Sequence, residues 1–223
     1  MTDPPDRPRR SRLSAAERRA SIVAAATEVF SEVGYQCGTM SEVARRVGVS
    51  EPVIFQNYGS KAAVFVAVLQ EAMGRMTESM QERAAANESV GAWLSEFLAP
   101  EHLSRVHGGD SHHVLFADAM SHTSEPLVKE AIRRAHRTVA RTLADLLARG
   151  QVEGSVRREL DPQTGAWWLL SLLASQGFRT ATMPNRVRLE VQLGAMTLQA
   201  LTTDRGLPSH CSDRQRSPSP HRR

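Results

Sequence analysis

Two short helical patterns separated by one glycine, within residues 39–58, constrain the fold of this chain more than any other feature. Thr39 or Ser41 is positioned to cap the first helix, and Gly48 follows its last apolar residue. Ser50 stands where it can cap the second helix. Because the connection is so short, the two helices must cross steeply. The stretch therefore predicts a helix-turn-helix unit.

The second helix of this unit carries side chains suited to reading DNA. Val49, Ile54 and Tyr58 are expected to pack beneath it, and Ala44 is small enough for a close crossing. A side-chain amide can pair with adenine in the major groove, and a valine can contact a thymine methyl group. The outward face is therefore expected to present Pro52, Val53, Gln56 and Asn57 to a duplex.

A longer amphipathic segment, RRASIVAAATEVFSEVGY, precedes the helix-turn-helix. Its apolar residues recur at the three- and four-residue spacing of one helix face, which predicts a further helix packed on the unit. The core side of that helix is predicted to hold Ile22, Ala25, Ala26, Val29, Phe30 and Val33.

Several positions between Arg18 and Phe65 form one ungapped pattern: AA at 25 and 26, Phe30, GY at 34 and 35, Thr39, Ala44, GVS at 48 to 50 and GSK at 59 to 61. This pattern resembles the N-terminal domain of the TetR family of regulators. The resemblance implies a DNA-binding head, a second helical domain and a homodimer. It places DNA contacts at Thr39, Ser50, Glu51, Pro52, Val53, Phe55, Gln56, Asn57, Tyr58 and Lys61.

The sequence also departs from the family pattern. Its aromatic pair reads Phe55 then Tyr58, where tyrosine then phenylalanine is commoner, so the hydroxyl that often meets a phosphate is absent at 55. The remaining departures are Asn57 for a frequent histidine, Gly38 for a frequent threonine and Ala62 for a frequent glutamate.

The chain beyond the head reads as helices without a convincing strand, so the predicted fold is all-α with about nine helices. Helices are expected at 60–85, from Asn87 or Ser89 to about Pro100, 101–107, 111–121, 125–149, 162–182 and 185–203. We expect a basic disordered arm at 1–12, a helix-turn-helix domain at 13–62, an effector-binding and dimerisation domain at 63–203, and a disordered tail at 204–223.

The last two predicted helices are more apolar than the core of one monomer needs. Family members use the equivalent helices as a four-helix dimer interface, and packing within one chain is the alternative. The predicted interface consists of Trp167, Leu170, Ala174, Phe178, Val187, Val191, Gly194 and Leu198.

The resemblance also implies a small, largely hydrophobic effector in the second domain. The candidate contacts are Met73, Met76, Trp93, Phe97, Phe116, Met120 and Trp168. The competing and favoured interpretation of each is an ordinary core position, because methionine and aromatic side chains at helical spacing are typical of cores. Trp167 and Trp168 are neighbours on a helix and point about 100° apart, so one cavity can take only one of them.

Charge and composition support a regulator rather than an enzyme. Residues 1–65 carry nine cations against seven anions, and residues 204–223 five against two, while 66–203 is nearly balanced. No nucleophile motif, phosphate loop or dinucleotide fingerprint is found, and no cofactor is expected.

The cysteine, histidine and hydropathy patterns add little further chemistry. The two cysteines offer no disulfide framework, and no secretory or membrane segment is apparent, so a cytoplasmic location is expected. Six histidines lie between 102 and 136, but none are spaced as a helical zinc pair, and no metal site is predicted.

The sequence thus predicts a DNA-binding transcriptional regulator. It is expected to be a repressor that a small effector releases from a pseudo-palindromic operator. The alternative is a helical ligand-binding or adaptor protein that keeps the fold without binding an operator.

Overall fold

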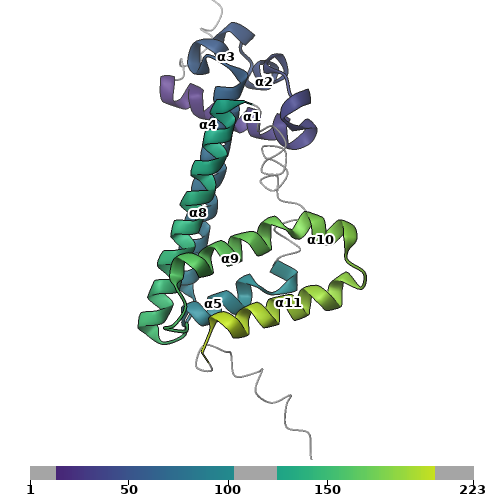
Figure 1. The fold of residues 1–223 in the computed structure, drawn as a ribbon. Coiled ribbons are helices and arrows are strands. Elements are labelled where there is room, and N and C mark those ends of the chain that lie inside the picture. The colour runs from purple at the N-terminus through teal and green to yellow at the C-terminus, as the bar shows by residue number, and fades with distance from the viewer. Residues whose placement is uncertain (1–13, 103–124, 204–223) are drawn as a thin grey trace, which may run out of the picture. The chain divides into compact units, whose positions relative to one another are not determined.

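The computed structural model describes residues 14–102 and 125–203. These residues form helices and one isolated backbone bridge between Val156 and Thr202, which confirms the all-α prediction for the described ranges. The helices are α1 (Ala15–Cys37), α2 (Met40–Val47), α3 (Glu51–Tyr58), α4 (Lys61–Ala86), α5 (Val90–Phe97), α8 (Pro126–Glu153), α9 (Pro162–Ala174), α10 (Gln176–Thr182) and α11 (Arg186–Leu201) (Figure 1).

The described residues divide into two compact units. Unit 1 contains residues 14–69 and 125–129, and unit 2 contains residues 70–102 and 130–203. The boundary falls inside α4, after Leu69. No helix of the described ranges is long and apolar enough to cross a membrane.

Unit 1 has a core built from one face of each of its helices. Ser14 caps α1 through a reciprocal pair of hydrogen bonds with Glu17, which satisfies two otherwise unpaired backbone donors. Phe30 and Phe65 meet edge to face at 5.2 Å between ring centroids. The fully buried side chains here include Ile22, Ala26, Phe30, Val43, Ile54, Val64 and Phe65.

The predicted core side of α1 is right except at its end. Val33 was expected in the core but is 51% exposed. Gly34, the next residue, takes φ 75° and ψ 171°, which interrupts the helix inside α1. The apolar stripe therefore ends at Phe30, and Tyr35 packs on the rings of Phe30 and Phe65 in its place.

Unit 2 is held together by close approaches at small residues. A Cβ on Gly150 would lie 2.4 Å from Val156, and one on Gly165 would lie 2.8 Å from Leu147. Because real Cβ atoms do not approach so closely, these positions need glycine or a shifted neighbour. The largest fully buried side chains of the unit are Leu94, Leu143, Leu147, Leu169 and Leu201, with Trp93 at 2% exposure.

The single helix predicted over 162–182 is wrong, because the chain breaks at Ser175 into α9 and α10. The Arg179 guanidinium donates to the Leu172 carbonyl and to the Ser175 hydroxyl, both at 2.6 Å. A continuous helix would use the Leu172 carbonyl internally. The side chain of Arg179 stabilises the break by supplying that carbonyl with a donor.

Candidate nucleic-acid interface

The turn between α2 and α3 has the geometry of a helix-turn-helix. The Thr39 hydroxyl accepts from the Glu42 N–H at 3.2 Å, so Thr39 is the cap of α2. Gly48 ends α2 with φ 77° and ψ 35°, a left-handed conformation that costs glycine nothing. The N–H groups of Gly48 and Val49 both donate to the Ala44 carbonyl, at 2.9 and 3.0 Å. These bonds fix the angle at which α3 leaves the turn.

The helix α3 has one buried side and one exposed side. Ile54 is fully buried beneath it, as predicted. Pro52 and Gln56 are exposed, whereas Val53 and Asn57 are half-buried. Of the four residues that we expected on the face toward DNA, only Pro52 and Gln56 are thus exposed to solvent.

Two side chains, one at the N-cap of α3 and one near the end of the helix, behave differently from the sequence expectation. Ser50 occupies the N-cap position, but its side chain makes no capping hydrogen bond, because the Val53 N–H donates to the Ser50 carbonyl instead. The Asn57 amide donates to the Val53 carbonyl in the preceding turn at 2.7 Å. Gln56 is therefore the fully exposed side-chain amide of α3.

The remaining predicted DNA contacts lie around this helix. Ser50 and Glu51 are exposed, and Phe55 is 40% exposed. The Lys61 ammonium donates to the Gln36 carbonyl at 3.0 Å and lies 4.7 Å from the centroid of the Tyr35 ring. Lys61 is thus already oriented by the last residues of α1.

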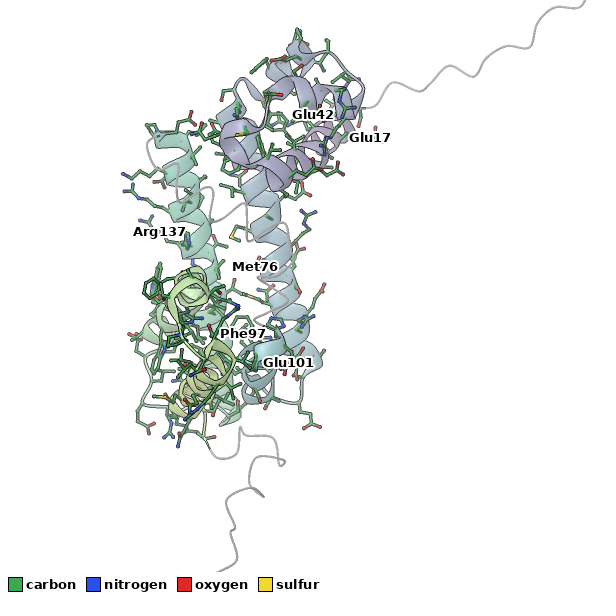
Figure 2. All side chains as sticks on the ribbon, turned by 90° about the vertical axis from the view of Figure 1, so that its right-hand side faces the viewer. Glu17, Glu42, Met76, Phe97, Glu101 and Arg137 are labelled. Atoms are coloured by element: carbon green, nitrogen blue, oxygen red, sulfur yellow. The ribbon has the colours of Figure 1, made fainter. Side chains whose placement is uncertain are left out.

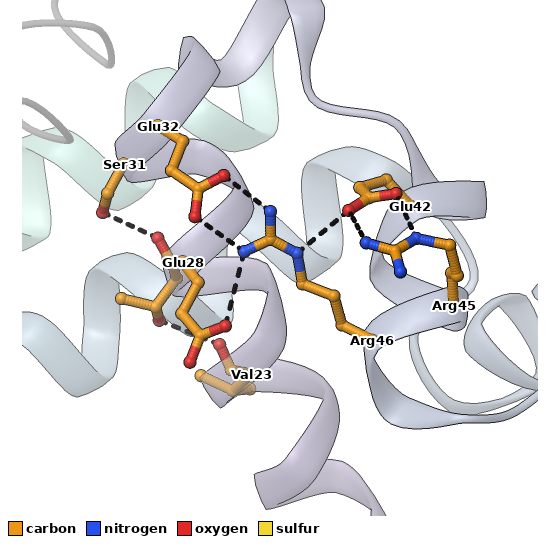
Figure 3. A network of polar contacts seen from close by, with 8 residues as sticks. Val23, Glu28, Ser31, Glu32, Glu42, Arg45 and Arg46 are labelled. Atoms are coloured by element: carbon orange, nitrogen blue, oxygen red, sulfur yellow. Dashed lines mark hydrogen bonds and ion pairs between the residues drawn. The ribbon is translucent and has the colours of Figure 1, made fainter.

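An ionic network that sequence reasoning missed joins α1 to α2 (Figure 3). Arg46 binds Glu32 at 2.6 Å, Glu42 at 3.0 Å and Glu28 at 3.4 Å, and Arg45 binds Glu42 at 2.7 Å. Hydrogen bonds from Arg45 and Arg46 lower the pKa of Glu42 to about 2. The three- and four-residue spacing of Glu42 from these arginines was visible in the sequence, but the carboxylates of α1 come near only in the fold.

Comparison with known proteins agrees with this geometry. Residues 22–68 match the model of the bacterial regulatory proteins, tetR family. Residues 22–68 thus match the DNA-binding domain of TetR-family regulators. The matched family and the curated relatives are transcription regulators, which agrees with the expectation that the chain is not an enzyme.

Two curated relatives of this chain are named as regulators. The HTH-type transcriptional activator FasR of Mycolicibacterium smegmatis is 29% identical over 152 residues, which cover 63% of this chain and 64% of FasR. The fatty acid metabolism regulator protein of Bacillus subtilis is 26% identical, over 63% of this chain and 71% of the relative. The aligned region thus spans about two thirds of each relative.

Solved structures share the fold at lower sequence identity. A TetR-family regulator from Mesorhizobium loti aligns with a TM-score of 0.67 at 17% identity, over 85% of this chain and 96% of the other. The regulator FadR from Bacillus subtilis, solved with stearoyl-CoA, aligns with a TM-score of 0.64 at 18% identity, over 81% and 98%. At these identities the likeness shows the TetR-family fold alone.

The predicted effector contacts fall into three groups. Met73 and Trp93 are buried, and the Trp93 ring stacks on Phe97 at 4.9 Å between centroids. Met76 on α4 is half-buried, and Trp168 on α9 is 43% exposed; Figure 2 shows Met76 and Phe97. Phe116 and Met120 lie outside the described residues.

Most predicted interface residues are open on the single chain. Trp167 is 45% exposed, Phe178 71%, Val187 78% and Val191 47%. Ala174 is exposed, and Leu170 and Leu198 are half-buried. Gly194 is different, because a Cβ there would lie 2.8 Å from the Leu98 carbonyl oxygen of the same chain. Its small size is already required by packing at the end of α5.

The histidines do not form a cluster in the described ranges. His136 contacts the Ile132 carbonyl in its own helix at 2.9 Å, and the His102 ring lies 5.6 Å from the Phe97 ring. His107, His112, His113 and His122 lie outside the described residues. Within the described residues no group of three metal-ligating side chains is found.

Proposed function

We propose that this chain is a transcriptional repressor that binds operator DNA through α3 of a homodimer. The observation that carries the proposal is the exposed Gln56 amide on a helix whose opposite side is fixed by the buried Ile54. Adenine presents matching groups to such an amide in the major groove. Pro52 and Phe55 add exposed apolar surface for thymine methyl groups.

A two-fold dimer would place two such helices on neighbouring half-sites. A symmetric dimer reads a pseudo-palindrome whose half-sites are about one helical turn apart. The exposed Trp167, Phe178 and Val187 of the last three helices support the proposal, because large apolar side chains gain stability when an interface buries them.

We further propose that a hydrophobic effector, with a long acyl chain as the first class to test, releases the protein from its operator. The support comes from the apolar Met73, Trp93 and Phe97 side chains of unit 2. It also comes from one relative named for fatty acid metabolism and from one structural neighbour solved with stearoyl-CoA.

These roles divide the chain as the sequence suggested. We assign DNA binding to residues 13–62, with the helix-turn-helix at about 39–58, and effector binding and dimerisation to 63–203. The basic arm predicted at 1–12 and the tail predicted at 204–223 lie outside the described residues. The cytoplasm, where the operator is accessible, is the proposed location.

The DNA-binding proposal is tested by fluorescence anisotropy with duplexes from the DNA that flanks this protein's own gene. A scrambled duplex of the same length and composition is the control. Specific binding should exceed scrambled binding by about a thousandfold or more. Equal binding to both duplexes, or none, would favour a ligand-binding or adaptor protein that keeps the fold without an operator.

The effector proposal is tested by adding stearoyl-CoA, stearate or coenzyme A to the protein with and without operator. At 100 times its dissociation constant, an effector of the free protein should stabilise the fold by about 2.7 kcal/mol. Release by stearoyl-CoA and stearate but not by coenzyme A would assign recognition to the acyl chain. If none of the three shifts either melting or DNA binding, the acyl class is wrong.

A further inference from the structure

Arg19 on α1 and the last turn of α3 are joined by three contacts. The Arg19 guanidinium donates to the Asn57 carbonyl at 3.0 Å and lies 4.5 Å above the centre of the Tyr58 ring. In the opposite direction, the Tyr58 hydroxyl donates to the Arg19 carbonyl at 3.1 Å. Each residue therefore binds the other helix through its side chain.

This arrangement depends on the reversed order of the aromatic pair. The chain has Phe55 and Tyr58, so the phenolic hydroxyl stands on the side of α3 that faces α1. A phenylalanine at 58 would keep the ring but lose the donor to the Arg19 carbonyl. The contact is thus particular to the residues this chain carries.

The acceptor that Arg19 binds belongs to the exposed end of α3. The last carbonyls of a helix lack partners within the helix, and a cation near them is stabilised by the helix dipole. Asn57, whose carbonyl accepts this bond, is the residue directly after Gln56, the proposed reader. A rotation of this last turn would therefore move the Gln56 amide with it.

We propose that Arg19 is a positioning residue for DNA specificity, which sets the pose of Gln56 by clamping the end of α3. This inference rests on the proposed operator binding. Arg19 acts through Asn57 and Tyr58 and need not touch DNA. Its removal should consequently reduce discrimination between operator and scrambled DNA, and not merely total affinity.

The experiment compares Arg19→Ala, Arg19→Lys and Tyr58→Phe in the full chain, with Arg18→Ala as the matched control. Arg18 is the adjacent cation on α1, so its loss removes the same charge from the same turn. Dissociation constants for operator and scrambled duplexes are measured at several salt concentrations. Circular dichroism and melting temperature verify that each variant is folded.

Arg19→Ala removes one hydrogen bond and the cation–π contact, and it should lower the operator-to-scrambled ratio by about tenfold. Tyr58→Phe removes one hydrogen bond and should lower the ratio by about threefold. Arg19→Lys should recover part of the ratio, since it keeps the charge but not the forked donors. Arg18→Ala should leave the ratio unchanged. The Arg19→Ala, Tyr58→Phe double variant should lose less than the product of the two single effects.

Two outcomes would overturn the inference while leaving operator binding intact. Arg19→Ala could weaken both duplexes equally and reduce the salt slope by about one, which would make Arg19 a phosphate contact. Alternatively, Tyr58→Phe could match the parent in ratio, with the double variant equal to Arg19→Ala. A parent protein that itself does not discriminate would instead refute the proposed function.

Discussion

The Tyr35 hydroxyl donates a 2.8 Å hydrogen bond to the Glu125 carboxylate, ninety residues further along the chain. Both residues belong to unit 1, and Glu125 stands directly before α8. Burial and the neighbouring carboxylate raise the pKa of Tyr35, so the hydroxyl remains a donor at every physiological pH. The bond ties the end of α1 to the residues that open α8.

Loss of that bond should destabilise unit 1 modestly. We expect Tyr35→Phe to lower the free energy of unfolding by about 1 kcal/mol, because the exposed Glu125 can rehydrate. Urea unfolding followed by circular dichroism measures the change. Glu125→Gln is the control, since its amide oxygen still accepts, and it should cost less. An equally stable Tyr35→Phe protein would show that the bond contributes nothing in solution.

The Arg46 network should make unit 1 sensitive to acid. The pKa of Glu42 is depressed to about 2 from 4.5, so its stabilisation is fully present above the unfolded value and is lost as the pH falls from 4.5 toward 2. The pKa of Glu32 is lowered by Arg46 in the same direction. Melting temperature should therefore fall through this window. Glu42→Gln should flatten the profile, whereas Glu28→Gln, at the longest contact, should change it least.

Gln56→Ala and Lys61→Ala should separate base reading from phosphate contact. Gln56→Ala is expected to cost about 1 to 3 kcal/mol on the operator and little on scrambled DNA. Lys61→Ala should weaken both duplexes and reduce the salt slope by about one. Titration by anisotropy at several salt concentrations distinguishes the two. Equal losses on both duplexes for Gln56→Ala would place the reading face elsewhere.

The ion pair between Arg179 and Glu190 is buried, so breaking it should be more harmful than replacing it. The Arg179 Nε to Glu190 Oε1 distance is 2.9 Å, and the two side chains are 7% and 10% exposed. Glu190→Ala leaves a buried cation without its carboxylate and should cost about 3 to 5 kcal/mol. The double variant Arg179→Met, Glu190→Leu should be markedly more stable than Glu190→Ala in chemical denaturation. The opposite order would mean that the charges themselves hold α10 to α11.

A charge on the proposed dimer surface should dissociate the protein. Val187→Glu puts a carboxylate into an apolar interface, and sedimentation velocity should then show monomers at concentrations where the parent is dimeric. Val152→Glu is the matched control, because Val152 is 86% exposed at the end of α8, outside the proposed interface. If both variants stay dimeric, α11 is not the interface.

The sequence was sufficient for the elements whose signals are local. Thr39, Gly48, Ser89 and Asp161 act at helix ends where a short-range rule places them, and α3 has Ile54 beneath it as its spacing requires. Caps and turns depend on a few neighbouring dihedral angles, so a single sequence contains the information.

The misses arose where backbone conformation and side-chain hydrogen bonds, rather than apolar spacing, decide. Val33 follows the helical stripe of α1, but its exposure depends on the backbone of Gly34 and on where Tyr35 packs. The break at Ser175 depends on Arg179, whose guanidinium reaches back to α9. For the same reason, the half-buried position of Asn57 could not be read from its amide chemistry.

The ionic network between α1 and α2 also determines how the folded head meets DNA at long range. Residues 14–65 carry five cations and five anions, so this part of the chain is formally neutral. Arg45 and Arg46 are matched by Glu28, Glu32 and Glu42, which leaves Arg18, Arg19 and Lys61 as its other cations. The electric field of DNA does little to raise the association rate of a domain with no net charge. The field still exerts a torque on that domain when its charges are unevenly distributed. Electrostatic attraction is thus expected to orient residues 14–65 relative to the duplex more than it accelerates their approach. The association rate should therefore depend on the cations of residues 1–12.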